Sequence, residues 1–152
     1  MISIYTDGSC RDNGKKGAIG AWGYIIIDND IIVRCAAESV EDTTNQIMEL
    51  TAALQCCKAA EELYSSFTDI CIYSDSAYLI NCINDKWYEK WEHNGWTTSK
   101  KQAVINPDLW KELIPFFEKA NFHFKKVKGH ANNRWNNEID QMVQRISASK
   151  GV

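Results

Sequence analysis

The chain has 152 residues, of which 45% are hydrophobic and 11% are aromatic, and its formal net charge is −3. A chain of this length can bury one sizeable core, so we expect a single domain over residues 1–152. No apolar stretch approaches a membrane span and the first residues lack a secretion signal, which excludes membrane and exported classes and predicts a soluble, cytoplasmic protein.

The net charge conceals an uneven distribution along the chain. Residues 1–85 carry 5 Lys and Arg against 13 Asp and Glu, whereas residues 86–128 carry 9 against 5. This division indicates a carboxylate-rich centre beside a basic segment that can hold phosphates. Ordinary solvated surface charge is the alternative explanation of the same counts.

The first predicted elements are three strands. Ile2 to Ser9 alternates two sets of side chains with the period of a strand, and a glycine-containing turn leads into a second strand from Ala18 to Asp28. The residues 28–30 form a predicted hairpin turn into a third strand, from Ile31 to Glu38. Because the turns are short, we expect an antiparallel meander.

The periodicity then changes to that of helices. Thr44 is a predicted N-cap, and Ile47, Leu50, Leu54 and Cys57 recur at helical spacing after it. The later predicted elements are a strand from Ile70 to Ser74, a helix from Ser76 to Ile83, a short helix and loop from Lys86 to Trp96, a helix from Pro107 to about Ala120, a strand from Phe122 to Val127 and a helix from Asn136 to Ser147. This order predicts an α/β fold with a five-stranded mixed sheet, three antiparallel strands followed by two parallel ones, and helices on both faces.

Six cysteines carry no recognisable spacing motif. They form neither a Cys-x-x-Cys pair nor a cluster with histidine, and a chain of this size can fold without disulfides. We therefore expect reduced thiols, with Cys56 and Cys57 acting as small buried hydrophobes in a helix.

Two predicted strands end in similar residues, Thr6-Asp7-Gly8-Ser9 and Ser74-Asp75-Ser76. A helix lies between the first and fourth strands, so we expect these strands to be parallel neighbours. Because adjacent strands lie roughly 4.8 Å apart, Asp7 and Asp75 would be side by side. Two carboxylates this close repel each other unless a proton or a cation lies between them.

Two helical acids extend this pair. Glu49 shares one side of its helix with Ala52, Ala53 and Cys56, although a glutamate in solvent at the helix edge is the alternative. Asp140 lies beside the apolar stripe of the last helix, where surface aspartates are also common. Four carboxylates suit hard divalent cations such as Mg²⁺, and two cations roughly 3.5–4 Å apart serve phosphodiester hydrolysis.

One histidine is a candidate for proton transfer. His130 lies in the predicted loop 128–133, and a histidine side chain can transfer a proton near neutral pH. A solvated loop histidine with no catalytic part is the alternative.

Four motifs resemble, in order and spacing, the signature of type 1 ribonuclease H. They are Thr6-Asp7-Gly8-Ser9, Asn45-Gln46-Ile47-Met48-Glu49-Leu50, Tyr73-Ser74-Asp75-Ser76 and Val127-Lys128-Gly129-His130-Ala131 ahead of Asp140. The resemblance covers nearly the whole chain. It implies a ribonuclease H-like fold and an endonuclease that hydrolyses the RNA strand of RNA–DNA hybrids, leaving 3′-hydroxyl and 5′-phosphate ends.

The resemblance also implies roles for the acidic residues. Asp7, Glu49, Asp75 and Asp140 would hold two Mg²⁺ ions, with Mn²⁺ as an alternative, and Asp7 and Asp75 match the bridging positions. His130 matches a loop histidine linked to proton transfer or product release. We therefore expect all five residues to be catalytic.

The partner implied by the resemblance is an RNA–DNA hybrid, and we expect a monomer that needs no membrane and no obligate protein partner. Asn13 and Thr44 match a pocket for a DNA-strand phosphate, and Trp91 matches an aromatic residue that packs on a deoxyribose. Asp42 stands where relatives often place arginine, which should weaken DNA-strand binding. The full set of implied substrate contacts is Cys10, Asn13, Thr44, Asn45, Gln46, Trp87, Trp91 and Asn136.

Three alternatives to this interpretation remain open. Another nuclease of the same fold, such as an integrase, a junction resolvase or a reverse-transcriptase domain, would share the carboxylate geometry. A non-catalytic nucleic-acid-binding module would not benefit from four clustered acids, which argues against it. A thiol-redox or zinc protein has no spacing motif in its favour.

Overall fold

A computed structural model of the chain describes residues 1–13, 15–98, 100–127 and 133–150, without the side chains of residues 149 and 150. Its elements follow the predicted order. They are β1 (Ile2–Arg11), β2 (Ile19–Asp28), β3 (Ile31–Glu41), α1 (Asn45–Leu63), β4 (Ile70–Ser74), α2 (Ala77–Asn84), α3 (Trp87–His93), α4 (Pro107–Phe117), β5 (Phe122–Lys126) and α5 (Arg134–Lys150).

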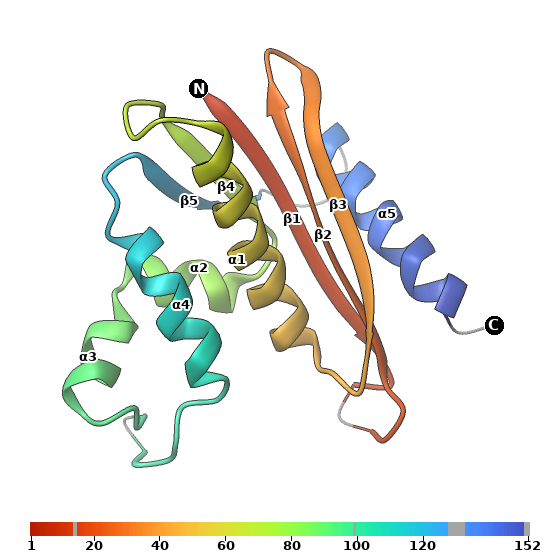
Figure 1. The fold of residues 1–152 in the computed structure, drawn as a ribbon. Coiled ribbons are helices and arrows are strands. Elements are labelled where there is room, and N and C mark those ends of the chain that lie inside the picture. Colours follow the sequence, from red (N-terminus) through yellow and green to blue (C-terminus); the bar gives the residue numbers. More distant parts are fainter. Residues whose placement is uncertain (14, 99, 128–132, 151–152) are drawn as a thin grey trace.

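The strands form one five-stranded mixed sheet with the order β3-β2-β1-β4-β5 (Figure 1). β1 pairs antiparallel with β2 and β2 antiparallel with β3, whereas β4 is parallel to both β1 and β5. The expected sheet, three antiparallel strands followed by two parallel ones, is therefore confirmed.

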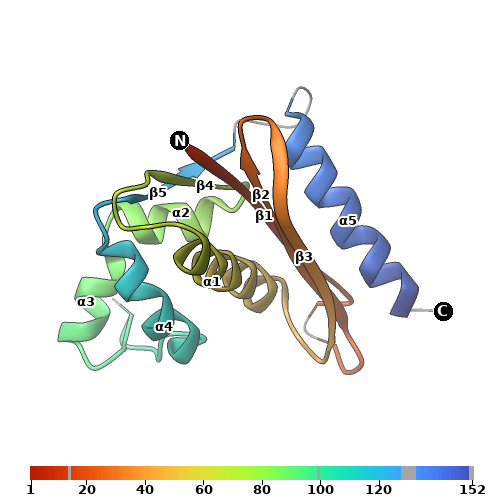
Figure 2. The same ribbon diagram turned by 45° about the horizontal axis from the view of Figure 1, so that its top comes forward.

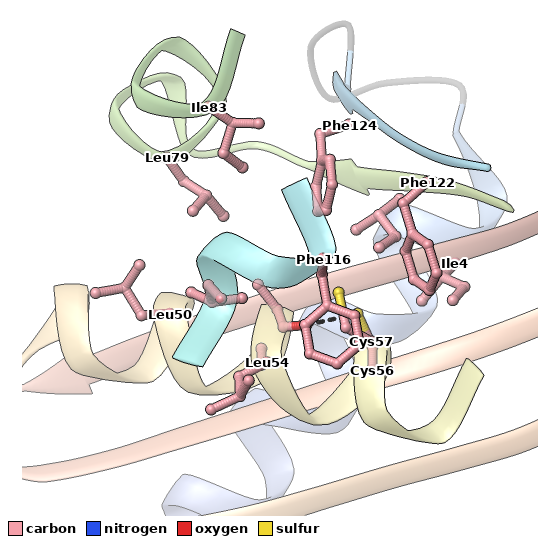
Figure 3. Close-up of a cluster of buried hydrophobic side chains, with 14 of the residues drawn as sticks. Ile4, Leu50, Leu54, Cys56, Cys57, Leu79, Ile83, Phe116, Phe122 and Phe124 are labelled. Atoms are coloured by element: carbon pink, nitrogen blue, oxygen red, sulfur yellow. Dashed lines mark hydrogen bonds between the residues drawn. The ribbon is translucent and has the colours of Figure 1, made fainter. Parts of the chain in front are cut away.

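Helices cover both faces of the sheet, as expected. α1 packs on β1 and β2 from one side, with α4 against it, and α5 packs on β1, β2 and β3 from the other (Figures 1 and 2). The larger hydrophobic core lies on the α1 side and includes Cys56 and Cys57 of α1, Phe116 of α4, and Phe122 and Phe124 of β5 (Figure 3). A smaller cluster under α5 consists of Ala21, Ile25, Ile27, Ile139 and Val143.

The cysteines behave as expected from their spacing. All six are free thiols, and Cys56 and Cys57 are completely buried in the larger core. Burial raises the pKa of the Cys57 thiol well above its ordinary value, so this side chain is a neutral hydrophobe. Within the described part of the chain, no helix combines the length and the apolar character that a membrane span requires.

Several element boundaries differ from the sequence expectation. β1 continues to Arg11 rather than Ser9, and α5 ends at Lys150 rather than Ser147. β3 continues to Glu41 rather than Glu38 because its last residues pair with Ile19 to Ala21 of β2. α4 ends at Phe117, three residues before the expected end. α5 begins at Arg134, because the side chain of Asn133 accepts a hydrogen bond from the main-chain N–H of Asn136 (3.0 Å) and caps the first turn.

Some helix starts can be predicted from a capping residue in the sequence, and others have no such residue. Thr44 accepts a hydrogen bond from the main-chain N–H of Ile47 (3.2 Å), so the predicted N-cap of α1 is confirmed. By contrast, α3 and α4 begin after residues in the left-handed conformation, Lys86 (φ 55°) and Asn106 (φ 58°), with no side-chain cap.

Candidate active site

The strand register brings Asp7 and Asp75 to the same edge of the sheet. β1 and β4 are paired from Ile2 with Ile70 to Tyr5 with Tyr73, and continuing this register by two residues aligns Asp7 with Asp75. The rings of Tyr5 and Tyr73 stack with centroids 4.9 Å apart, two residues before the aspartates on the same side of their strands. The structure therefore brings this predicted pair together.

Asp7 is the buried member of the pair. Its side chain lies under α5 with 8% of the residue exposed, whereas Asp75 is exposed at the end of β4. Burial is the main cause that raises the pKa of Asp7 from 3.8 to about 8, followed by the negative charge of Asp75 and a hydrogen bond with Asp140. The main-chain N–H of Gly8 opposes this shift. Asp7 therefore holds a proton at neutral pH unless a cation replaces it.

Glu49 reaches the site from α1, which touches β1 at a glycine. A Cβ atom on Gly8 would lie 2.4 Å from the carbonyl carbon of Met48 and 2.5 Å from the nitrogen of Glu49. Only glycine permits this approach, because both neighbours are backbone atoms. The half-buried Glu49 carboxylate then faces Asp75. Burial is the main cause that raises the pKa of Glu49, and the negative charge of Asp75 raises it further.

Ser76 orients Glu49 and was not singled out from the sequence. Its hydroxyl accepts the main-chain N–H of Leu79 (3.2 Å) as the N-cap of α2, and its own proton is donated to Glu49, which opposes the rise in the pKa of that carboxyl. The signal available in the sequence was a serine directly after Asp75 and before a helix.

Asp140 comes to Asp7 from α5 on the other face of the sheet. α5 is held there by Ile139 and Val143, whose side chains would lie 3.0 and 3.2 Å from a Cβ atom on Gly23. Gly23 is the β2 residue paired with Asp7. Because Gly23 has no side chain, α5 can approach the sheet closely at the level of the buried Asp7 carboxylate. Asp140 is exposed, and the amide Nε2 of Gln144 donates a hydrogen bond to its Oδ2 (3.1 Å).

The four predicted carboxylates are thus linked in pairs: Asp7 with Asp75, Asp7 with Asp140, and Glu49 with Asp75. Across the described ranges, no three histidine, cysteine or acidic side chains lie close enough together to hold a metal ion. The donor set nevertheless fits hard divalent cations, because it consists of carboxylate oxygens that repel one another. His130 and the rest of the loop 128–132 lie outside the described residues.

Five predicted substrate contacts surround the start of α1. The Asn13 side-chain oxygen accepts the main-chain N–H of Asn45 (3.0 Å), and the Cys10 thiol lies 3.4 Å from the carbonyl oxygen of Thr43. Thr44 caps the helix, while Asn45 is exposed and Gln46 half-buried in its first turn.

Asp42 takes part in the loop next to this group. Its Oδ1 accepts the main-chain N–H of Gly17 (2.9 Å), and its backbone is left-handed with φ 52°. The carboxylate therefore holds the β1–β2 connection, on the same side as the predicted phosphate contacts.

The two predicted tryptophans lie at a separate hollow of about 320 Å³. It is lined by Tyr78, Trp87, Lys90, Trp91, Asn94, Thr97 and Thr98. Trp91 is 7% exposed because it packs edge-on against the fully buried Trp110 (5.3 Å between ring centroids), so only part of its ring faces the hollow. The sequence reasoning missed Lys90 and Asn94, although their helical spacing from Trp87 and Trp91 could have identified them as part of the same face.

Asn136 is half-buried in the first turn of α5, four residues before Asp140. This spacing places both residues on the same side of the helix. The structure therefore puts the predicted amide on the side of the site, one helical turn from the last carboxylate.

The chain is similar in sequence and in fold to known proteins of one family. The model of the family RNase H matches residues 1–148. A ribonuclease H from Syntrophomonas wolfei is 44% identical over 150 residues, covering 99% of this chain and 98% of the relative. Two solved structures share the fold at lower identity. A foamy viral protease–reverse transcriptase in complex with double-stranded DNA is 22% identical with a TM-score of 0.82, covering 97% of this chain and 94% of that chain. LC11-RNase H1 in complex with an RNA/DNA hybrid is 16% identical with a TM-score of 0.71, covering both chains completely.

Proposed function

The chain belongs to the ribonuclease H family, and from this premise we propose that it is an endoribonuclease that hydrolyses the RNA strand of RNA–DNA hybrids. The observation that carries the proposal is the buried Asp7 carboxylate, placed against both Asp75 and Asp140. A buried carboxylate surrounded by like charges destabilises a protein unless it serves a cation or a proton transfer. The similarity in sequence extends over nearly the whole chain of the S. wolfei relative, which supports the same activity here.

Asp7, Glu49, Asp75 and Asp140 are the residues that would hold the divalent cations. We propose two Mg²⁺ ions, with Mn²⁺ as a substitute. When bound, such ions supply a water of lowered pKa and neutralise charge on the reacting phosphate. The products would be 3′-hydroxyl and 5′-phosphate ends.

The chain's own residues prepare this site in three ways. Burial, with the neighbouring Asp75 and Asp140, raises the pKa of Asp7 to about 8, so binding of a cation by this carboxylate would be coupled to release of its proton. Ser76 holds the Glu49 carboxylate through a donated hydrogen bond, and Gln144 holds Asp140. His130 would transfer a proton or assist product release.

Hybrid recognition would use two surfaces. The polar residues at the start of α1 (Cys10, Asn13, Thr44, Asn45 and Gln46) would contact the RNA strand and a DNA-strand phosphate, and Asn136 would assist beside Asp140. The hollow at Trp87 and Trp91 would take the DNA strand, where an added 2′-hydroxyl is disfavoured. We also propose that residues 1–152 act as one domain, as a monomer, in the cytoplasm.

The proposal is tested by cleavage of labelled RNA–DNA hybrid, RNA duplex and DNA duplex in Mg²⁺ or in EDTA. We expect cutting of the hybrid alone, only with Mg²⁺, and only in its RNA strand. Asp75→Asn should reduce the rate by roughly a hundredfold or more with nearly unchanged folding. Asp30→Asn, in the exposed β2–β3 turn, is the matched control and should retain full activity.

The same assay separates the alternatives. Equal cutting of DNA duplex would favour another nuclease of this fold, and metal-independent binding without any cutting would favour a non-catalytic module. Either result would contradict the proposed activity.

A further inference from the structure

A polar groove leads away from the carboxylates between β1 and α5. Asp7, Ser9 and Arg11 alternate along β1 toward the face that α5 covers, because successive strand residues point to opposite faces. On α5, Asp140 and Gln144 are one turn apart and are joined by a hydrogen bond. Gln144 therefore connects the acidic site to the groove, which is lined by Ser9 and Arg11 of β1 and by residues of α5.

Two adjoining hollows make up this groove. One, of about 390 Å³, is lined by Ser9, Arg11, Gln144, Ser147 and Ala148. The other shares Gln144 and Ala148 with it and is completed by Gln141 and Arg145. The two hollows adjoin at Gln144 and Ala148, with Arg11 lining the first and Arg145 lining the second, and we refer to both together as the groove.

Both arginines keep hydrogen-bonding capacity toward the groove. Arg11 is exposed and donates from Nη2 to the carbonyl oxygen of Ser147 (3.1 Å), and Arg145 donates from Nη2 to Oε1 of Gln141 (3.2 Å). A guanidinium group has five N–H donors, so each of these contacts uses only a part of them. In the portion of the chain that the structure describes, neither arginine forms an ion pair with a carboxylate, in contrast to Arg34.

We propose that this groove binds backbone phosphates of the RNA strand beyond the cleaved bond, with Arg11 as the main contact and Arg145 at the outer rim. The inference rests on the proposed function, because it takes the strand held at Asp7 and Asp140 to be the one that is cut. Arg11 lies about 13 Å from Asp7 along an extended strand, so it would contact a phosphate a few nucleotides away from the cleaved one.

The electrostatics of the site explain why such a contact is useful. The acidic site does not attract a polyanion until cations bind, so the attraction must come from groups outside it. A guanidinium group binds phosphate through paired N–H donors, which fixes position as well as providing charge. Gln144 connects the groove to the site, because it lines the groove and also orients Asp140.

The first test measures hybrid cleavage by the full chain in Mg²⁺ at several salt concentrations. Arg11→Gln should raise KM roughly five- to tenfold, leave kcat nearly unchanged, and reduce the slope of log(kcat/KM) against log[salt] by about one. Arg11→Lys should largely restore the slope because it keeps the charge. Arg34→Gln removes the same charge from an exposed pair with Glu62 on β3 and α1 and should change neither quantity.

The second test uses hybrids with one neutral methylphosphonate linkage at successive positions of either strand. In the wild-type protein, the linkage opposite Arg11 should raise KM, and in Arg11→Gln that same linkage should have no further effect. Non-additivity confined to the DNA strand, or an Arg11→Gln variant indistinguishable from Arg34→Gln, would overturn the inference while leaving hybrid cleavage intact. Failure of the wild-type protein to cut any hybrid would overturn the proposed function and this inference together.

Discussion

Replacing Asp7 by asparagine should stabilise the protein in metal-free buffer. The wild-type carboxyl has a pKa of about 8 in the folded protein, raised first by burial and then by Asp75 and Asp140, against an ordinary value of 3.8. A raised pKa in the folded state means that folding binds a proton. The contribution of Asp7 to stability is therefore fully present below pH 3.8 and is lost as the pH rises toward 8.

The size of this effect follows from the two pKa values. Each pH unit above 3.8 costs the folded state about 1.4 kcal/mol until the pH reaches the folded pKa, which sets a ceiling of about 4 kcal/mol at pH 7 and about 2 kcal/mol at pH 5. Water that enters a metal-free site screens part of this cost, so we expect roughly half of the ceiling. Asp7→Asn removes the cost while keeping the size of the side chain.

The measurement is the free energy of unfolding in urea with EDTA, at pH 5, 6, 7 and 8, for the wild type, Asp7→Asn and the control Asp30→Asn. Asp7→Asn should exceed the wild type by an amount that increases with pH, and Asp30→Asn should not. Added Mg²⁺ should reverse the order at pH 7, because a ligand at a hundred times its Kd stabilises the wild type by about 2.7 kcal/mol, more than the roughly 2 kcal/mol that Asp7 costs there. A variant less stable than the wild type at pH 8 in EDTA would refute the argument.

Three further predictions concern packing, capping and substrate binding. Gly8→Ala should destabilise the protein by roughly 3 kcal/mol or more and abolish activity, because the new methyl group would lie 2.4 to 2.6 Å from backbone atoms of Met48 and Glu49. Gly23→Ala should cost less, because its nearest contacts are longer (3.0 to 3.2 Å) and two of the three are side chains that can move. Thermal unfolding that reversed this order would contradict the prediction. Thr44→Ala should lose about 1 kcal/mol of stability and Thr44→Ser nearly none, and equal losses in urea unfolding would exclude a capping effect. Lys90→Gln changes an exposed residue of the hollow beside α3 and should raise KM for the hybrid without changing the melting temperature. It should also reduce the slope of log(kcat/KM) against log[salt] by about one, and an unchanged slope would show that this hollow is not part of the binding surface.

The order of elements could be predicted because each segment has a clear period. The strand alternation from Ile2 and the helical spacing from Thr44 are local properties, and both are found in the structure. The end of β3 could not be predicted, since Glu41 is in a strand only because β2 offers Ile19 as its partner. Likewise, α5 starts early because Asn133 caps it, a signal that is weak among neighbouring polar residues.

The proximity of the candidate acids was predictable to different degrees. Asp7 and Asp75 could be paired from the sequence because β1 and β4 end in similar motifs. In two parallel strands that are paired in register, equivalent positions at the strand ends are neighbours in space. Asp140 had no such signal, since its position depends on how closely α5 approaches the sheet at Gly23. The roles of these residues remain predictions, and so does that of His130, which lies outside the described residues.

The hollow beside α3 could be predicted only in part. Trp87 and Trp91 were identified by resemblance, whereas Tyr78 of α2 and Thr97 and Thr98 are brought there by packing between segments. Thr97 is positioned by an isolated antiparallel β-bridge to Ala103, and no helical or strand periodicity in the sequence predicts this contact.

The glycines next to Asp7 also bear on how faithfully the chain folds. Gly8 gives clearance to α1 on one face of the sheet, and Gly23, opposite Asp7, gives clearance to α5 on the other. A slip of one residue between β1 and β2 would turn Asp7 into the apolar core beneath α1 and misplace both clearances. A misaligned hairpin would therefore be less stable than the correctly paired one. The glycines that allow the acidic residues to come together would in this way also disfavour a misfolded register.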